Sequence, residues 1–397
     1  MDNIRIITYV REQVLADALL ADGRLAELSL TLKEQTSILG NIYIGKVRNI
    51  VANIQSAFVE IEHGMLCYLP LEDVKAPIYT RPKKQERLTV GDELLVQVSR
   101  EAVKTKAPSV TTNLNLTGKY LVLTTGNRIT GYSSKLKAEE KSRLKRLLGT
   151  WELPEVGLIV RTNAGQADEE ELRTEYDRLI RNYRFLTEQA VHRTVFSCVQ
   201  KSRPDYLTSI LGSRSESLKE ILTDDPGLYR QIKEFLLEEM PHDAGKLRLY
   251  EDSGLPLKAL YRLEKGLSDA LASRVWLKSG AYLVIEPTEA LTVIDVNTGK
   301  YTKGKKKQET VQKINQEAAR EIARQLRLRN LSGIILVDFI DMDEKEAKEE
   351  LLTLMRELLK GDPLKAAAVD LTELGLMELT RKKQKKTLLE QAKECGL

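Results

Sequence analysis

Two short stretches decide the fold, LTVIDVN at residues 291–297 and IILVDFID at residues 334–341. Each is an apolar, β-branched run that ends in acidic side chains, which is typical of a buried strand followed by a polar loop. Between them, apolar residues recur at helical spacing over residues 309–329, which predicts a long helix with one buried face. A strand, a returning helix and a second strand predict neighbouring strands in one sheet.

Asp295 and Asp338 stand at the ends of these two strands. If the helix returns the chain to the same sheet, both carboxylates emerge near one edge, where α/β folds commonly bind ligands. Close carboxylates repel each other unless a cation lies between them, and Mg²⁺, or Mn²⁺ in its place, suits oxygen ligands. Such an ion polarises a phosphodiester and activates a water molecule. The alternative is structural: Asp295 caps a turn and Asp338 caps a helix.

The remainder of the last third of the chain is equally regular. Strands are predicted at residues 280–286 and 290–296, and a helix is predicted at residues 344–359. Asp341 has two open interpretations, as a partner of the metal ligands or as a cap for the helix that follows.

Upstream, the pattern changes twice. Short strands punctuated by glycine predict a small β-barrel, and after residue 113 a mixed α+β unit follows. Residues 204–271 suggest a second small α/β module, which we expect to pair with the N-terminal strands. The predicted strands are residues 4–10, 26–33, 41–50, 57–62, 67–71, 93–100, 120–124, 157–161 and 246–250, and the predicted helices are residues 138–148, 168–185, 218–222 and 227–240.

Composition narrows the class of protein. A chain of 397 residues with 42% hydrophobic and 30% charged residues is typical of a globular protein of about two to four domains. No apolar run approaches membrane-spanning length and the N-terminus does not resemble a signal peptide, so we expect a cytoplasmic protein. Three cysteines and three histidines, all widely separated, exclude a disulfide framework and a local zinc motif. Any metal should therefore be held by oxygen.

Nucleic-acid binding cannot be argued from a net charge of only +4. Local basic clusters would have to carry it, although most charge runs are solvated faces. The clusters are residues 303–307, the helix residues Arg320, Arg324, Arg327 and Arg329, and residues 381–386.

The predicted barrel brings Phe58 and Tyr68 onto neighbouring segments, with Lys106 available for phosphates. Bases stack on exposed aromatic rings of barrels that bind single strands, while basic side chains follow the backbone. The alternative is that the rings belong to the barrel core.

A further candidate site follows the strand at residues 157–161, which runs into a glycine-flanked polar turn. This turn could form an anion pocket or simply an exposed loop.

Taken together, these stretches resemble the catalytic half of the ribonuclease E/G family, and the resemblance runs through nearly the whole chain. The segments that carry it are NIYIGKV at 41–47, AFV at 57–59, GLIVRT at 157–162, EALTVIDVN at 289–297, EAAREIARQLRLR at 317–329, DFIDM at 338–342 and GLMELTR at 375–381.

The resemblance implies a multidomain α+β chain. Its parts would be an RNase H-like subdomain split between residues 1–35 and 206–275, an OB-type barrel of the S-one kind at 36–118, a 5′ sensor at 119–205, a DNase I-like catalytic domain at 276–390, and a truncated zinc-link region at 391–397.

The resemblance also implies residue roles. Asp295 and Asp338 match the family's Mg²⁺ ligands, and Asn297 matches the residue that orients the metal and the scissile phosphate. The RNA-contacting residues of the barrel would be Phe58, Tyr68 and Lys106, and the 5′-monophosphate site would comprise Arg161, Thr162 and Lys135.

The implied reaction is hydrolysis of single-stranded RNA by metal-activated water, leaving 5′-phosphate and 3′-hydroxyl ends, in rRNA and tRNA processing and mRNA decay. The main alternative is a non-catalytic RNA-binding or ribosome-assembly protein, and a deoxyribonuclease is the third.

Two departures from the family pattern alter these expectations. The family's Cys-x-x-Cys zinc link is missing, since the sequence ends Cys395-Gly396-Leu397, so we expect no zinc-linked dimer, although a homo-oligomer remains open. The sensor region reads Gly131–Lys135 where the family tends to have arginine, which predicts weaker dependence on the 5′ end.

Overall fold

A computed structural model describes residues 3–33, 37–62, 64–83, 87–102, 107–151, 156–214, 216–299, 307–372 and 374–397. The chain divides into two compact units of mixed α/β type. Unit 1 comprises residues 1–35, 215–233 and 245–397, and unit 2 comprises residues 36–214 and 234–244.

The first sheet of unit 1 joins the N-terminus to the middle of the chain. Its strand order is β15-β14-β1-β2-β3, with β14 parallel to β1 and the three N-terminal strands antiparallel to one another. The pairing expected between these two segments is therefore confirmed. The strands are β1 (Asn3–Arg11), β2 (Val14–Ala21), β3 (Arg24–Leu32), β14 (Leu218–Thr223) and β15 (Leu247–Leu249).

For this sheet one prediction was wrong and one strand was not predicted. The helix predicted at residues 218–222 is strand β14, and strand β2 was not predicted. Leucine, lysine, glutamate and alanine favour helices, but parallel pairing with β1 buries Leu218, Ile221 and Leu222. Tertiary pairing overrides local propensity here. Helices α5 (Leu257–Leu260), α6 (Leu263–Leu271) and α9 (Leu388–Glu394) share the apolar core of this sheet.

The second sheet of unit 1 contains the two acidic strands. Its order is β16-β17-β18-β19-β21-β20, and β18 and β19 are parallel neighbours joined through helix α7, as predicted. The elements are β16 (Arg274–Trp276), β17 (Tyr282–Pro287), β18 (Leu291–Asn297), α7 (Lys307–Leu328), β19 (Gly333–Asp338), α8 (Lys345–Lys360), β20 (Ala366–Leu371) and β21 (Leu376–Arg381).

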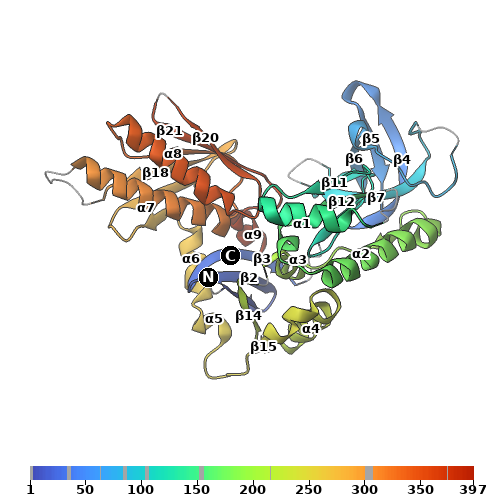
Figure 1. Cartoon of the computed structure of the whole chain (residues 1–397), viewed down its shortest axis with the longest axis horizontal. Helices are drawn as coiled ribbons and strands as arrows, with labels where there is room; N and C mark the ends of the chain where they lie inside the picture. Colours follow the sequence, from blue (N-terminus) through green and yellow to red (C-terminus); the bar gives the residue numbers. More distant parts are fainter. Residues whose placement is uncertain are drawn as a thin grey trace. The chain divides into compact units, whose positions relative to one another are not determined.

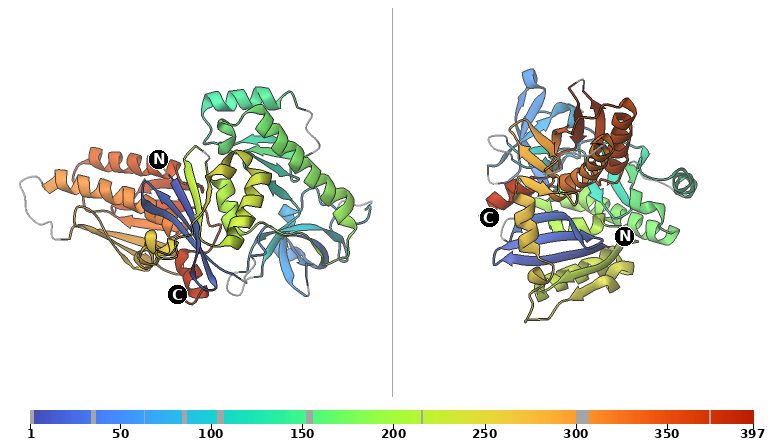
Figure 2. Two further views of the ribbon diagram at one scale, coloured as in Figure 1. Left: turned by 90° about the horizontal axis from the view of Figure 1, so that it is seen from below. Right: turned by 90° about the vertical axis from the view of Figure 1, so that its left-hand side faces the viewer.

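The two faces of this sheet differ. Alternate residues such as Ile294, Val296 and Val337 are buried in a core shared with α7 and α8, which lie side by side along one face (Figures 1 and 2). The residues between them point the other way, and Val293 and Ile334 are exposed. We call this second side the open face.

Unit 2 contains a closed five-stranded barrel, in which β4-β5-β6-β8-β7 pair in order and β7 pairs back with β4. This confirms the predicted barrel and is consistent with an OB-type fold. Gly45 lies where strands pack closely, because a Cβ there would lie 2.6 Å from Val59 Cγ1. The strands are β4 (Ile42–Val51), β5 (Ser56–Glu60), β6 (Leu66–Pro70), β7 (Glu93–Arg100) and β8 (Ser109–Thr111), with β13 (Cys198–Gln200) added beside β4.

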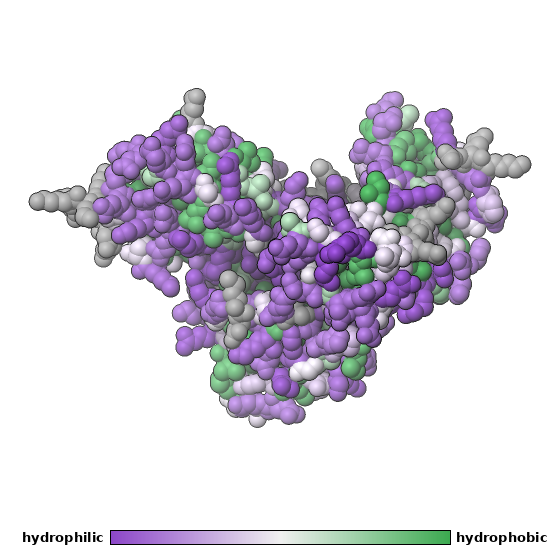
Figure 3. Space-filling view, viewed as in Figure 1, coloured by the Kyte–Doolittle hydropathy of each residue, from purple (hydrophilic) through white to green (hydrophobic). Residues whose placement is uncertain are grey.

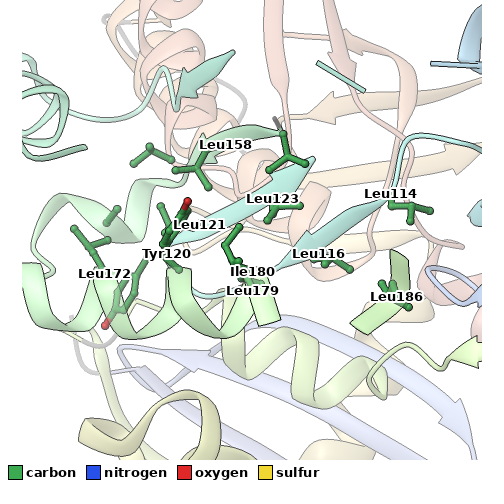
Figure 4. Close-up of a cluster of buried hydrophobic side chains, with 14 of the residues drawn as sticks. Leu114, Leu116, Tyr120, Leu121, Leu123, Leu158, Leu172, Leu179, Ile180 and Leu186 are labelled. Carbon is green, nitrogen blue, oxygen red and sulfur yellow. The ribbon is translucent and has the colours of Figure 1, made fainter. Parts of the chain in front are cut away.

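The rest of unit 2 is built around a four-stranded sheet of order β11-β12-β10-β9. Leucines from the strands meet Leu172, Leu179 and Ile180 of helix α2 in one core (Figure 4). Asp168 caps α2 in a capping box with Glu171, which satisfies free N–H groups at the helix start. The elements are β9 (Asn115–Thr117), β10 (Leu121–Thr124), β11 (Thr130–Tyr132), α1 (Ala138–Leu148), β12 (Gly157–Val160), α2 (Glu169–Arg184), α3 (Asp205–Gly212) and α4 (Pro226–Glu239), the last of which contributes residues to both units.

Hydrophilic side chains cover most of the face drawn in Figure 3, with apolar side chains scattered among them. Within the described ranges, no helix combines the length and apolar character needed to span a membrane.

Candidate active site

Asp295 and Asp338 lie directly opposite each other on the parallel strands β18 and β19. Directly paired residues point to the same face of a sheet, and both carboxylates belong to the open face. Asp295 is half-buried and Asp338 is exposed. The structure therefore brings together the two acids that the sequence paired, in an accessible position.

The electrostatics of this pair are unfavourable without a counter-charge. Burial raises the pKa of Asp338, and the negative charges of Asp295 and Asp341 raise it further. Like charges held together disfavour ionisation. A bound cation would reverse this effect, because it stabilises the ionised carboxylates.

Asn297 lies two residues after Asp295 on the same side of β18, since side chains alternate along a strand. Its Nδ2 donates a hydrogen bond of 2.5 Å to Oδ2 of Asp295. This bond fixes the rotation of one carboxylate and leaves the other oxygen of Asp295 for a further partner.

The alternative capping roles are wrong. Asp295 lies within β18, and the N-cap of α8 is Glu344, so neither Asp338 nor Asp341 caps that helix. Asp341 therefore does not cap the helix that follows. The remaining interpretation is a partner of the metal ligands, and the charge of Asp341 does act on Asp338.

The sequence did not single out Asn315, which is fully buried on α7. Its Nδ2 donates to the carbonyl oxygen of Ile340 at 2.8 Å, and its Oδ1 accepts from the N–H of Ile340 at 3.1 Å. Asn315 thereby holds the loop that links Asp338 to Asp341. A polar residue beside apolar Val311, Ile314 and Ala318 was the signal that could have revealed it.

The donor set fits Mg²⁺ better than a soft metal. Mg²⁺ in proteins uses one or two carboxylates and keeps several waters, and Asp295 and Asp338 supply two such groups. Across the residues that the structure describes, no group of three or more histidine, cysteine, aspartate or glutamate side chains is placed to hold a metal ion. The donors therefore suit a hydrated, oxygen-bound cation.

The carboxylates lie on a sheet face and do not line the cavity found elsewhere in unit 1. That cavity, of about 470 Å³, is lined by residues that include Ser273, Glu286 and Arg329. An open face suits a long polymer better than a small molecule, since small ligands are usually enclosed in concave pockets.

In unit 2, Phe58 and Tyr68 face each other across β5 and β6. Their ring centroids are 6.2 Å apart at an interplanar angle of 74°. Both are half-buried, whereas their neighbours Ala57, Val59, Cys67 and Leu69 fill the barrel core. The two rings therefore lie on the outer surface, and the core interpretation is wrong. Lys106 lies outside the described residues.

Two of the predicted 5′-phosphate residues, Arg161 and Thr162, directly follow β12, which pairs in parallel with β11. The hydroxyls of Ser133 and Thr162 are 2.8 Å apart, and Lys135 is exposed nearby in sequence. Arg161 is half-buried and donates a hydrogen bond to the carbonyl oxygen of Gly118, and burial lowers the pKa of its guanidinium. One N–H group of the Arg161 guanidinium is thus already hydrogen-bonded within the protein.

The predicted basic clusters are partly internal, although Lys382 and Lys383 are exposed. On α7, Arg324 pairs with Glu321, and Arg327 pairs with Glu27 of β3. Arg329 is buried, which lowers its pKa to about 10. Of residues 381–386, Arg381 is buried against Asp362 at 2.8 Å, while residues 303–306 lie outside the described ranges. Arg320 alone of the four helix arginines is exposed.

Comparison with known proteins identifies the family of the chain. The model of the Ribonuclease E/G family matches residues 115–384. Ribonuclease G of Haemophilus influenzae is 34% identical over 98% of this chain and 81% of its own length. Ribonuclease E of a Synechocystis species is 36% identical over 90% of this chain but 55% of its own length, and Ribonuclease G of Escherichia coli is 31% identical over 92% and 77%. The chain thus spans about half the length of its ribonuclease E relative and most of its ribonuclease G relatives. On the extent of these matches, the chain belongs to the ribonuclease E/G family.

Proposed function

We propose that this protein is an endoribonuclease that hydrolyses phosphodiester bonds of single-stranded RNA, in rRNA and tRNA processing and mRNA decay. The observation that carries the proposal is the direct pairing of Asp295 with Asp338 on an open sheet face, in a chain whose relatives are named ribonucleases.

Asp295 and Asp338 would hold the Mg²⁺. When bound, this ion supplies Lewis-acid polarisation of the phosphate and a water of lowered pKa. Asn297 keeps Oδ2 of Asp295 oriented through its 2.5 Å hydrogen bond, and Asn315 holds the loop after Asp338. The protein contributes positioned ligands and an accessible face, and no histidine is required as acid or base.

Phe58 and Tyr68 would hold the RNA through their bases. Both rings lie on the outer surface of the barrel in an edge-to-face pair, and stacking on exposed rings tolerates any base. Lys46 and Arg48 are paired with Glu93 and Glu60 respectively, so we assign the barrel's role to its rings and to Lys106.

A catalytic test separates chemistry from binding. Asp295→Asn and Asp338→Asn should each lower Mg²⁺-dependent cleavage of a single-stranded RNA by roughly 100- to 1000-fold, because loss of a metal ligand removes several kcal/mol of transition-state stabilisation. RNA binding should persist. Asp370→Asn, an exposed acid on β20 of the same sheet, is the matched control and should cleave normally.

Two outcomes would contradict the proposal. Full cleavage by either site variant would remove the assigned ligands. Binding without cleavage, with Mg²⁺ or Mn²⁺ supplied, would favour the non-catalytic RNA-binding alternative, and a parallel assay on single-stranded DNA tests the third candidate, a deoxyribonuclease.

The 5′-phosphate assignment has its own test. We propose that Thr162, Ser133 and Lys135 contact the terminal phosphate and that Arg161 supports them. The proposal is supported by the contact between the Ser133 and Thr162 hydroxyls after the parallel strands β11 and β12, and by the exposure of Lys135 two residues after Ser133. Arg161→Ala should narrow the rate difference between 5′-monophosphate and 5′-hydroxyl substrates. Arg128→Ala, which lies outside this turn, is the control and should leave the rate ratio unchanged. An unchanged ratio in Arg161→Ala would contradict the assignment.

A further inference from the structure

Trp276 is the most exposed aromatic side chain on the catalytic sheet, with 63% of its surface accessible. Exposure of a large apolar ring costs solvation free energy and commonly marks an interaction site. The residue lies on β16, the edge strand, and belongs to no part of the site described so far.

Trp276 is one member of a compact cluster. Its ring centroid lies 5.1 Å from that of Tyr282, at an interplanar angle of 55°. The guanidinium of Arg274 lies 4.6 Å from the Tyr282 centroid and 5.9 Å from the Trp276 centroid. We call Arg274, Trp276 and Tyr282 the aromatic platform. It combines flat apolar surface with one cation, which complements a base and its phosphate.

Strand register places this platform beside the carboxylates. One row across the sheet runs from Trp276 through Tyr282 to Asn297. The adjacent row on the same face runs from Arg274 through Val284 to Asp295 and on to Asp338. Since neighbouring strands are about 4.8 Å apart, Trp276 lies roughly 10 Å across the sheet from Asn297.

The hairpin that carries the platform is held in place by other contacts. The carboxylate of Glu317 on α7 accepts from the N–H of Lys278 at 2.8 Å and of Ser279 at 3.3 Å. Gly299, with φ +63°, packs so closely that a Cβ there would lie 2.3 Å from the carbonyl oxygen of Gly280. The turn after Trp276 is thereby fixed against the carboxyl end of β18.

We infer that the aromatic platform is a base-stacking subsite for single-stranded RNA, with Trp276 stacking on a base and Arg274 contacting a phosphate. The inference rests on the proposed function, because the shared rows define where the substrate must pass. A span of roughly 10 Å corresponds to about one to three nucleotides from the scissile bond. The subsite would select unpaired RNA, since only an unstacked base can reach the ring.

Binding is tested without cleavage. In the full chain carrying Asp295→Asn, Trp151→Phe leaves Trp276 as the sole tryptophan. Titration with a single-stranded oligoribonucleotide should quench its fluorescence. Trp276→Ala should weaken binding roughly 5- to 150-fold, as expected for one lost stacking contact, and Trp276→Phe should recover most of it. Ile334→Ala, which trims an exposed apolar side chain at the opposite end of β19 on the same face, should bind normally.

Abasic substrates locate the contact. Removing the base at successive positions around the scissile bond should reveal one position where Trp276→Ala no longer has an effect. If Trp276→Ala leaves binding unchanged, or if no abasic position is coupled to it, the inference is wrong. If Trp276→Ala instead alters the mass of the free protein in light scattering while RNA binding is unchanged, the surface is a contact between copies of the chain, which also overturns it.

The two proposals fail separately. Cleavage with normal Trp276→Ala binding would remove the subsite and leave the nuclease. Quenching of Trp276 and coupling to one abasic position, in a wild-type protein that never cleaves, would support the subsite and remove the nuclease.

Discussion

Asn315 shows how a single buried residue supports the candidate site. Buried polar side chains are costly unless hydrogen-bonded, and Asn315 satisfies itself through both backbone groups of Ile340. Both of these hydrogen bonds go to Ile340 and not to a proposed metal ligand. We therefore regard it as a positioning residue for the loop from Asp338 to Asp341.

Replacing Asn315 with leucine should both destabilise unit 1 and slow cleavage. The N–H and C=O of Ile340, which is half-buried, would lose these partners, at a cost of up to about 1–3 kcal/mol. Urea denaturation measures the free energy of unfolding. The Mg²⁺ concentration that gives half-maximal cleavage measures the apparent affinity of the site for the ion. Loss of stability with an unchanged Mg²⁺ requirement would reduce Asn315 to a structural role, and Gln316→Leu, its neighbour on α7, is the control.

Basic residues that cluster in the sequence are not necessarily exposed in the structure. Arg329 and Arg381 belong to basic clusters in the sequence, yet both are buried, and Arg381 is paired with Asp362. A run of like charges does not reveal which members find a distant acidic partner.

At the scale of elements, helix α7 joins the two sheets of unit 1. Its inner face packs in the core of the catalytic sheet, while Arg327 donates to Glu27 on β3 at 2.7 Å and Arg324 donates to the carbonyl oxygen of Leu25. Glu27 is also within 3.5 Å of Arg5. Arg324 and Arg327, two of the arginines predicted as a basic cluster, thus attach one sheet to the other.

The Glu27 contact should make stability depend on pH. Although burial alone would raise the pKa of Glu27, the positive charges of Arg5 and Arg327 outweigh it and the pKa is lowered. A carboxylate with a lowered folded-state pKa stabilises the fold above its unfolded pKa, about 4.3, and this contribution is lost as pH falls through the folded value.

Glu27→Gln should therefore lower the free energy of unfolding at pH 7, and the difference from wild type should shrink as the pH falls below about 4. Chemical denaturation across pH 3–8, a range of about five units around this transition, measures the difference. Glu349→Gln, which removes an exposed pair with Lys345, should change stability by no more than about 0.5 kcal/mol. A pH-independent Glu27→Gln effect would contradict the assignment.

At the scale of the whole molecule, the proposed binding and chemical residues fall in different compact units. Phe58 and Tyr68 belong to unit 2, and the paired aspartates belong to unit 1. When two substitutions act independently, their effects on the free energy of RNA binding are expected to add.

Phe58→Ala should weaken single-stranded RNA binding by about 1–3 kcal/mol. The same loss should appear in the Asp338→Asn background, within about 0.5 kcal/mol. Fluorescence anisotropy with a labelled RNA measures both. Phe185→Ala, another partly exposed phenylalanine of unit 2, is the control, and a background-dependent loss would show that the two units act on RNA as one site.

Much of the molecule could be predicted from local pattern. Alternation and glycine spacing predicted the barrel, helical periodicity predicted α7 and α8, and acids after apolar strands predicted the Asp295–Asp338 pair. These features succeed because period and strand-end chemistry are properties of short segments. Strands β2 and β14 escaped prediction, since their burial depends on β1, which pairs with both.

The sequence by itself determined the family resemblance, the parallel strand–helix–strand unit and the identity of its acids. Only the tertiary structure decided that Asp295 and Asp338 share one register on an open face, that Asn315 holds the loop after Asp338, and that Trp276 lies in the adjacent row of the sheet, opposite Asn297. It also decided that Arg329 and Arg381 are internal. The physical reason is that register, burial and ion pairing depend on partners far away in the chain, which no local pattern specifies.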